Sequence, residues 1–436
     1  MSITNRRNFV IGLAASSAGV TPKVNAQSTS LAPSAFNLPI ASIDNIATHQ
    51  NYWSAVRNLY LISKQNINLE NGYWGIMAEP VHFDYVAKTE MVNRENSIYA
   101  RTQFGKDVES VRSQLAQAVG ADTSEIALTR GATEALQLLI AGFNKIKAGD
   151  TVIYSDLDYD SMQYGMKWLA DRRGANVVKF NIPEPATREN VLAAYQQILN
   201  DHPKTKLLLL THVSHRTGLV MPVPEIATMA KYRGVAVILD AAHSWGQIDF
   251  KVSELGVDFV GFNLHKWIGA PLGLGFMYIS KSKLTDIDRA MGDEDFPASD
   301  IRSRVHTGTV NFASILTLPT ALKLHNEIGA KAKELRVKHL RNYWVSRARE
   351  FKGLEILTPD EAGMHAGITS FRMKGKGTAE ENNALVAELR EKYGIFTVRR
   401  AGVAKGQCIR ISPAIYTTES ELDRLIDALR NITSMS

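Results

Sequence analysis

The chain has a single cysteine, Cys408, among 436 residues, which excludes an intrachain disulfide and any zinc site built from several thiolates. It also lacks a long run of Lys and Arg. The 50 basic and 44 acidic side chains leave a net charge of only +6, so the sequence predicts no nucleic-acid partner. With 45% hydrophobic and 22% charged residues, the composition is typical of a globular protein and not of a disordered, collagen-like or coiled-coil chain. At about 150 residues per domain, this length predicts two to three domains with a sizeable core.

Residues 1–26 predict a targeting segment. The pair Arg6-Arg7 precedes a short apolar stretch at 9–15 with no acidic residue before it, and Ala26 ends a small-residue cleavage pattern. The arginine pair resembles a twin-arginine (Tat) signal, whose alternative is a basic tail without an address. Because the apolar stretch is too short to cross a bilayer, no stable membrane span is expected. The prediction is a periplasmic protein, exported folded by the Tat machinery and starting near Gln27.

The mature chain divides by pattern into three parts. Residues 27–65 predict an N-terminal lead-in, 66–320 a large domain and 321–436 a small C-terminal domain. In the large domain, short apolar runs alternate with amphipathic stretches, which is typical of βαβ units around a mostly parallel, buried sheet. The expected strands are 126–129, 151–155, 177–182, 206–213, 235–241, 257–262 and 273–279, with helices from 133 and at 160–173, 188–199 and 223–233.

After residue 320 the pattern changes to that of a smaller α+β domain. One long helical stretch is expected at 317–350. Expected strands follow at 354–357, 367–373, 395–399 and 407–412, with helices at 379–392 and 419–431. Ligands of open parallel sheets bind beyond the carboxyl ends of the strands, so the residues that follow strands are the candidates for chemistry.

Three such places carry chemically useful residues. Asp240 ends an apolar strand, where it is either a helix cap or a buried carboxylate that needs a cationic partner. Lys266 ends the next apolar strand, where it is either a solvated lysine or a desolvated nucleophile toward carbonyls. Between a strand and a helix, Gly131, Ala132 and Thr133 can present backbone N–H groups to an anion. Together they match the needs of pyridoxal 5′-phosphate: a phosphate cradle, an acid at the pyridine nitrogen and a Schiff-base lysine.

The chain resembles the class V (fold type I) PLP-dependent aminotransferases over nearly all of residues 66–430. The resemblance rests on the ordered motifs LENGYWG (69–75), TRGATEAL (129–136), THVSHRTG (211–218), LDAAHSWG (239–246), NLHKW (263–267), HTGT (306–309) and IRISPAIY (409–416). The NLHKW form is similar to the isopenicillin N epimerase-like branch. The resemblance implies an α/β fold: a fold type I transferase with a mostly parallel sheet in the large domain and a smaller C-terminal α+β domain.

The resemblance also assigns roles. It implies that Lys266 forms the Schiff base, that Asp240 pairs with the pyridine nitrogen and that Arg410 binds the substrate carboxylate. Tyr159 stands where many members have a histidine stacked on the cofactor ring. The cofactor-binding set implied is Gly131, Ala132, Thr133, Tyr159, Asp240, His243, Asn263, His265, Lys266 and Thr309. Thr309 is expected to reach the phosphate of a neighbouring subunit, which implies a homodimer, and no metal site is expected.

Each role has a simpler alternative. His265 is otherwise a helix cap, His243 a core histidine, Thr309 a turn residue and Arg410 a surface arginine. Tyr159, together with a cysteine placed inside a strand two positions before Arg410, argues against the desulfurase branch. His215 stands where relatives often carry a smaller polar residue.

The predicted function is therefore a PLP enzyme that acts on the α-amino group of an amino acid or peptide-like substrate, as an aminotransferase or epimerase. Epimerisation needs a second proton path, for which Tyr159 is the nearest candidate. Three alternatives stay open: a C–S or other β-lyase, a tailoring enzyme for an exported metabolite such as a siderophore, and a non-catalytic binding protein of the same fold.

Overall fold

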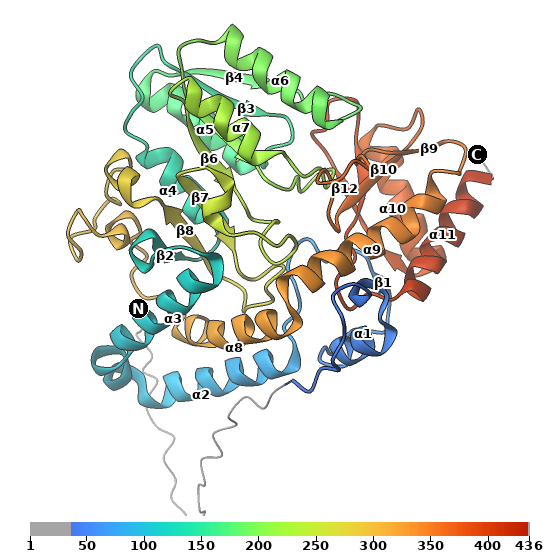
Figure 1. Ribbon diagram of the computed structural model, residues 1–436, viewed down its shortest axis with the longest axis horizontal. Coiled ribbons are helices and arrows are strands. Elements are labelled where there is room, and N and C mark those ends of the chain that lie inside the picture. The colour runs from blue at the N-terminus through green and yellow to red at the C-terminus, as the bar shows by residue number, and fades with distance from the viewer. Residues whose placement is uncertain (1–35, 435–436) are drawn as a thin grey trace, which may run out of the picture. The chain divides into compact units, whose positions relative to one another are not determined.

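The computed structural model describes residues 36–434, so the predicted targeting segment lies outside the described residues. A seven-stranded sheet forms the centre, with strand order β2-β8-β7-β6-β5-β3-β4 (Figure 1). All neighbours are parallel except β8, which runs antiparallel to both β2 and β7. The strands are β2 (Ile126–Thr129), β3 (Thr151–Ser155), β4 (Asn176–Phe180), β5 (Thr205–Thr211), β6 (Ala236–Asp240), β7 (Phe259–Asn263) and β8 (Gly275–Ile279). The predicted mostly parallel sheet is confirmed.

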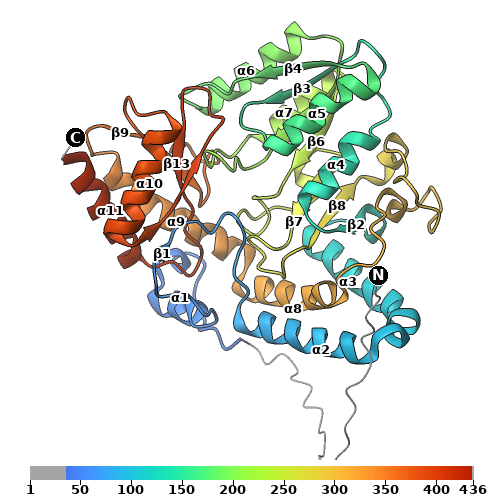
Figure 2. The same ribbon diagram turned by 180° about the vertical axis from the view of Figure 1, so that it is seen from behind.

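Side chains of this sheet alternate between two apolar layers. In β5, Leu207 and Leu209 face one hydrophobic cluster, and Leu208 and Leu210 face the other. Helices α4 (Ala132–Gly142) and α5 (Asp160–Arg173) cover the first face, and α6 (Arg188–Asp201) and α7 (Val223–Tyr232) cover the second. Figure 2 shows α4 and α5 on the near side of the strands. Burial on both faces explains why these strands read as continuous apolar runs.

The smaller C-terminal sheet is antiparallel, with strand order β12-β13-β10-β9. Its strands are β9 (Leu354–Ile356), β10 (Thr369–Met373), β12 (Val398–Arg400) and β13 (Cys408–Ile411), packed against α9 (Ala330–Ala348), α10 (Ala379–Tyr393) and α11 (Glu419–Ser434). The single strand expected at 395–399 is two, because β11 (Ile395–Phe396) pairs instead with β1 (Ile67–Asn68). The segment that precedes the large sheet therefore pairs, through β1, with a strand of the C-terminal part of the chain.

The long helix expected at 317–350 is wrong as one element. The structure has α8 (Phe312–Ile328) and α9, separated at Gly329, whose φ of 92° is outside the helical range. A side chain is strained at this φ, so glycine suits the break. Helix α8 lies beside α2 in both views (Figures 1 and 2), and α9 leads into the small sheet.

The sequence patterns gave no helices before residue 120, and the structure has three. They are α1 (Gln50–Arg57), α2 (Glu79–Thr102, interrupted at Asn96) and α3 (Phe104–Val119). Helix α1 falls inside the range predicted as a lead-in, and its Tyr52, Trp53 and Val56 are buried. Short 3-10 turns complete the chain at Ile46–Thr48, Thr123–Glu125, Val252–Leu255, Lys281–Asp286 and Ile301–Arg304.

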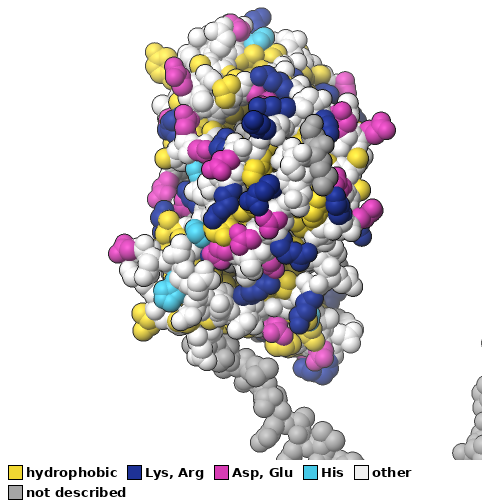
Figure 3. Space-filling view, turned by 90° about the vertical axis from the view of Figure 1, so that its right-hand side faces the viewer, with side chains coloured by type: hydrophobic (Ala, Val, Ile, Leu, Met, Phe, Trp, Pro, Cys, Tyr) yellow, Lys and Arg dark blue, Asp and Glu magenta, His cyan; other side chains and the backbone are white. Residues whose placement is uncertain are grey.

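The surface of the small domain carries both signs of charge. In Figure 3, Lys and Arg side chains are interspersed with Asp and Glu over this face, with no separate block of either sign. Within residues 36–434, none of the helices combines the length and apolar character that crossing a membrane would require.

Candidate active site

A cavity of about 500 Å³ opens at the carboxyl ends of the parallel strands. Thr211 ends β5, Asp240 ends β6 and Asn263 ends β7, and all three line it. The structure brings ten of the eleven sequence-predicted residues into its wall: Gly131, Ala132, Thr133, Tyr159, Asp240, His243, Asn263, His265, Lys266 and Arg410. This is the position that an open α/β sheet favours for a ligand.

Lys266 lies in the floor of the cavity beside His243. The lysine Nζ is 2.9 Å from His243 Nε2, and Trp267 Nε1 donates to His243 Nδ1 at 3.5 Å. Burial lowers the pKa of Lys266 to about 7, which the nearby Asp240 carboxylate only partly opposes. Burial also holds the pKa of His243 well below its usual value, so the imidazole is neutral. The environment therefore favours a neutral amine, the nucleophilic form of lysine.

Asp240 presents one oxygen to the cavity. Its Oδ1 accepts from the Ala242 N–H at 2.9 Å, which leaves Oδ2 without a partner among residues 36–434. Burial raises the pKa of Asp240. Beneath it, burial raises the pKa of Asp158 to about 7, although that carboxylate accepts from Ser155 and from the Thr211 hydroxyl at 2.7 Å. A cation at Asp240 Oδ2 would offset the cost of burying its charge.

Some hydrogen-bonding groups of the predicted phosphate site already have partners within the chain. Asn263 Oδ1 accepts from the Ala132 N–H at 2.8 Å, so Asn263 fixes the turn before α4. His265 Nδ1 donates to the Leu274 carbonyl at 3.1 Å, which leaves its Nε2 for a ligand. Thr133 is exposed at the N-terminal turn of α4. The helix N-terminus and these two side chains form an anion site, whereas the Ala132 N–H is already satisfied.

Tyr159 and His215 form the side wall. Their rings meet edge to face at 5.3 Å, and Tyr159 lines the cavity and is 38% exposed. Burial and nearby cations hold the pKa of His215 well below its usual value.

The loop that carries His215 is tied to the small domain. Arg216 Nη1 donates to the Ala401 carbonyl at 2.6 Å, and the Ser370 hydroxyl donates to the Arg216 carbonyl at 2.5 Å. Gly218 has a φ of 76°, and a Cβ there would lie 2.0 Å from the Ile368 carbonyl oxygen. Only glycine fits this close approach of two backbones, so the loop is held from both sides.

Arg410 is buried and not a surface residue. Its Nε donates to Glu70 Oε2 at 3.2 Å, its Nη2 donates to Glu70 Oε1, and its Nη1 donates to the His215 carbonyl at 2.7 Å. Arg400 Nη2 also donates to Glu70 Oε1, at 3.1 Å. Both arginines line the cavity. The two arginines of this wall therefore share one glutamate, Glu70, which lies behind them.

Thr309 lies outside the cavity and is exposed. It follows the 3-10 turn Ile301–Arg304 and precedes α8. Its predicted contact with the phosphate of a neighbouring subunit needs a second chain, so it stays a prediction.

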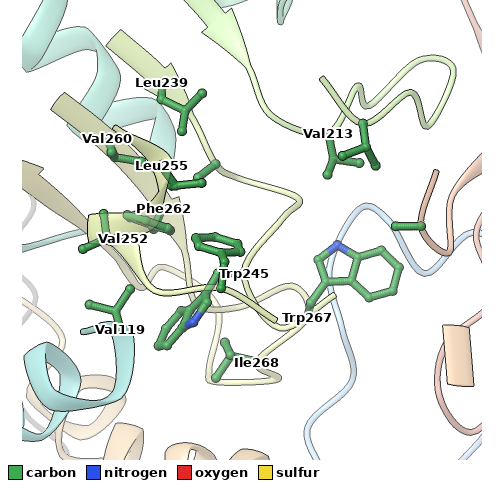
Figure 4. Packing of buried hydrophobic residues seen from close by; sticks show 14 of the residues in the cluster. Val119, Val213, Leu239, Trp245, Val252, Leu255, Val260, Phe262, Trp267 and Ile268 are labelled. Atoms are coloured by element: carbon green, nitrogen blue, oxygen red, sulfur yellow. The ribbon is translucent and has the colours of Figure 1, made fainter. Parts of the chain in front are cut away.

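The residues around Lys266 are anchored by apolar packing and one buried lysine. Trp267 and Ile268 belong to the main core cluster, together with Trp245 and Phe262 (Figure 4). The rings of Trp245 and Phe262 pack against each other in this cluster. Lys333 of α9 is buried and donates from Nζ to the Trp267 carbonyl at 2.6 Å. This packing limits the movement of the backbone that carries Lys266.

Sequence reasoning missed Arg400, which lines the cavity, and Glu70, which lies behind the wall and pairs with its arginines. Glu70 was inside the quoted motif LENGYWG, but nothing local showed that it would meet two arginines. Arg400 lies on a short edge strand with no distinctive pattern. His215 was noted as unusual, and the structure places it against Tyr159. The signal that could have identified these residues is that each is ionisable and lies in a quoted motif or near the end of a strand.

Comparison with known proteins identifies the family of the chain. The Aminotransferase class-V family model matches residues 84–425. Isopenicillin N epimerase of Streptomyces clavuligerus is 26% identical over 399 residues, covering 87% of this chain and 98% of the relative. A probable cysteine desulfurase of Vibrio cholerae is 26% identical over 421 residues, covering 91% and 94%.

Solved structures share the fold. A mutant of C-DES with glycine covalently linked to its PLP cofactor matches with a TM-score of 0.75 at 22% identity, covering 84% of this chain and 97% of that one. The cysteine desulfurase CsdA of Escherichia coli matches with a TM-score of 0.75 at 20% identity, covering 88% and 98%. The predicted fold type I architecture is confirmed.

The cavity residues fit pyridoxal 5′-phosphate. A volume of about 500 Å³ is within the range of small-molecule sites. Among the described residues, Asp240 Oδ2 has no hydrogen-bond partner, which suits a protonated ring nitrogen, and no carboxylate bonds to the Lys266 amine. Thr133 and His265 would hold the phosphate at the start of α4.

Proposed function

Because the chain belongs to the class-V aminotransferase family, we propose that it acts on the α-amino group of an amino acid or peptide-like substrate, as an aminotransferase or epimerase. The observation that carries the proposal is the convergence of Lys266, Asp240 and Arg410 on one cavity. A lysine with a lowered pKa, a carboxylate and a carboxylate-binding arginine are the groups that chemistry at an amino acid Cα needs.

Pyridoxal 5′-phosphate is the cofactor of this family and of this chain. When bound through Lys266, it takes up the electron pair that remains at Cα after a bond to that carbon breaks. The residues of the chain do the rest. Asp240 holds positive charge at the ring nitrogen, Arg410 orients the substrate carboxylate, and the Lys266 amine, once released, moves a proton at Cα.

Tyr159 supports the epimerase side of the proposal. It lies in the cavity wall and is 38% exposed, and its phenol is the group that we assign as the second proton donor that epimerisation needs. The isopenicillin N epimerase relatives point the same way. Transamination needs only Lys266, so both reactions stay within the proposal.

A β-lyase is the second candidate, because several relatives are cysteine desulfurases. Cys408 does not support sulfur transfer. It is buried inside β13, and burial raises its pKa to about 11, so little thiolate forms near neutral pH. Elimination without a thiolate remains open to this site.

We further propose a homodimer and export to the periplasm by the twin-arginine machinery. Exposed apolar side chains on α2 support the homodimer: Phe83 is 56% exposed and Ile98 is 71% exposed. Export rests on the sequence of residues 1–26. It favours the tailoring of an exported metabolite, since amino-acid metabolism is mainly cytoplasmic.

The test is incubation of the PLP-loaded protein with amino acids, following keto-acid release, deuterium exchange at Cα and sulfide together. Keto acid released without ammonia or sulfide identifies a transferase, exchange with inversion an epimerase, and keto acid together with ammonia or sulfide a lyase. Asp240→Asn should retain the cofactor but lower the rate of Cα exchange by about two orders of magnitude or more, because a neutral amide no longer stabilises the ring charge. The exposed Asp249→Asn is the matched control. Equal rates in the two variants would contradict the role of Asp240.

A further inference from the structure

Glu70 lies behind the cavity wall, where it pairs with the two lining arginines Arg400 and Arg410. It is buried, with a side chain only 7% exposed, and it accepts hydrogen bonds from two arginines through both oxygens. Its backbone is held as well, because the residues on either side of it bond to Ser412: Leu69 accepts from the Ser412 N–H at 2.7 Å, and the Asn71 N–H donates to the Ser412 carbonyl. Charge-assisted bonds of this kind are strong, so Glu70 does not leave the cluster readily.

The bonds to Glu70 decide which part of Arg410 remains for a ligand. Glu70 takes the side of the guanidinium formed by Nε and Nη2. The opposite pair, Nη1 and Nη2, keeps a hydrogen on each nitrogen, even though Nη1 also donates to the His215 carbonyl. One carboxylate can therefore bind Arg410 end-on while Glu70 stays in place.

Arg400 adds a second cation to the same wall. It lines the cavity and gives one bond to Glu70, and its buried Nε has no acceptor among the described residues. Two arginines and one glutamate leave the cluster with one net positive charge. The other arginine of the wall, Arg130, is exposed and pairs with Glu134 at 2.7 Å, so it adds no uncompensated charge.

We propose that Glu70 sets the charge of the substrate: the wall accepts one carboxylate and selects amino acids or peptide ends with an uncharged side chain over Asp- or Glu-like dicarboxylates. The inference rests on the proposed function. One carboxylate cancels the single net positive charge of the cluster, so a second carboxylate would lose its hydration with no net charge left to compensate it. Selectivity thus comes from Glu70, which neutralises part of the positive charge of the cluster, in addition to Arg410, which attracts the substrate carboxylate.

Isosteric ligands test this directly. Glutarate and glutaramate differ only in one carboxylate against one amide, and neither has an amine that could react with the cofactor. Calorimetry with the PLP-loaded wild-type protein is expected to give tighter binding of glutaramate. In Glu70→Gln the ratio of the two dissociation constants is expected to shift toward glutarate by about tenfold or more, because the cluster gains one net positive charge. Titration of L-Gln and L-Glu, read by the absorbance of the cofactor, should shift in the same direction.

Two further variants serve as a control and as a second test of the charge of the cluster. Glu355→Gln removes a partly buried glutamate that pairs with Arg372 outside the cavity, and it should leave the ratio unchanged. Arg400→Gln removes the net charge and should weaken glutaramate by about tenfold and glutarate by more. This variant also tests the proposal if Glu70→Gln does not fold, which circular dichroism would show.

The outcomes separate the two claims. An unchanged glutarate-to-glutaramate ratio in both Glu70→Gln and Arg400→Gln would overturn the role of Glu70 while leaving the proposed function intact. Binding of none of the four ligands to the wild-type protein would overturn the inference, whereas the proposed function is tested separately by keto-acid release, Cα exchange and sulfide. Tighter binding of glutarate than of glutaramate by the wild-type protein would also overturn the inference.

Discussion

At the scale of single residues, the protonation of Lys266 follows from its neighbours. Trp267 can only donate, so the Trp267 contact makes His243 Nδ1 an acceptor. A neutral imidazole then carries its proton on Nε2, which faces the Lys266 Nζ at 2.9 Å. An ammonium has no lone pair to accept that proton, whereas a neutral amine does. The indole of Trp267 thereby favours the nucleophilic form of the lysine through the ring of His243.

This arrangement predicts how the apoprotein captures its cofactor. The rate at which Lys266 captures added pyridoxal phosphate should rise with pH up to about 7 and then level off, because the neutral fraction of the amine rises through its pKa. An ordinary lysine with a pKa of about 10.4 would be only about one part in 2,500 neutral at pH 7 and would keep rising to alkaline pH. Borohydride trapping at timed intervals, read by mass, measures the rate. A profile that still rises tenfold per pH unit above 8 would show an unshifted lysine.

At the scale of elements, α9 supports the active site from outside the cavity. Lys333, in its first turn, donates to the carbonyl of Trp267, the residue after Lys266, and its Nζ also lies 3.2 Å from His325 Nδ1. Burial lowers the pKa of Lys333 to about 7. The helix therefore holds the peptide that carries the reactive lysine by a single buried amine.

Lys333→Met should lower the free energy of unfolding by about 1–3 kcal/mol, because the Trp267 carbonyl loses its donor in a buried place while the methionine still fills the space. Lys331→Met, two residues earlier on the same helix, is the control. Its side chain is 54% exposed, and its free energy of unfolding should change by no more than about 0.5 kcal/mol. Urea unfolding followed by tryptophan fluorescence compares them. Equal losses in the two variants would mean that the bond to Trp267 contributes nothing specific.

The elements also show where sequence patterns succeed. Buried parallel strands such as β3 and helix α5 were predicted with their observed bounds, because continuous apolar runs and end glycines are local signals. The helical pattern of 317–350 continued across Gly329, so the break between α8 and α9 was missed. Helix α2 was missed because its apolar side chains do not gather on one buried face, and several of them are exposed. The cavity residues at strand ends were predictable, whereas the pairing of Glu70 with Arg410 joins positions 340 residues apart.

At the scale of the whole molecule, the chain combines a cofactor site with a proposed export signal. The site is built from residues between positions 70 and 410, so it is independent of residues 1–26. A cofactor made in the cytoplasm must be bound before export, and the twin-arginine route carries folded proteins. The two properties can therefore be separated by experiment.

Replacing Arg6 and Arg7 by Lys should leave the protein in the cytoplasm, folded and yellow, since these residues are outside the site. Cell fractionation with the absorbance of the purified protein measures both properties. The double change Arg94→Lys with Arg101→Lys, on the exposed side of α2, keeps the same chemistry and should not affect location. Normal amounts of the Arg6/Arg7 variant in the periplasm would refute the twin-arginine assignment, and an unprocessed N-terminus on the exported wild-type protein would refute cleavage near Gln27.

The loop that carries His215 has one more consequence. It is bonded to the small domain through Arg216 and Ser370 and is pressed against the backbone at Gly218, while its His215 carbonyl holds Arg410. The position of the Arg410 guanidinium is thus held by the backbone of this loop and by Glu70. With the arginine held in place, we expect the cavity to fit an amine and a carboxylate on the same carbon. A β-amino acid has one more methylene between these two groups, so one of them would lie out of position.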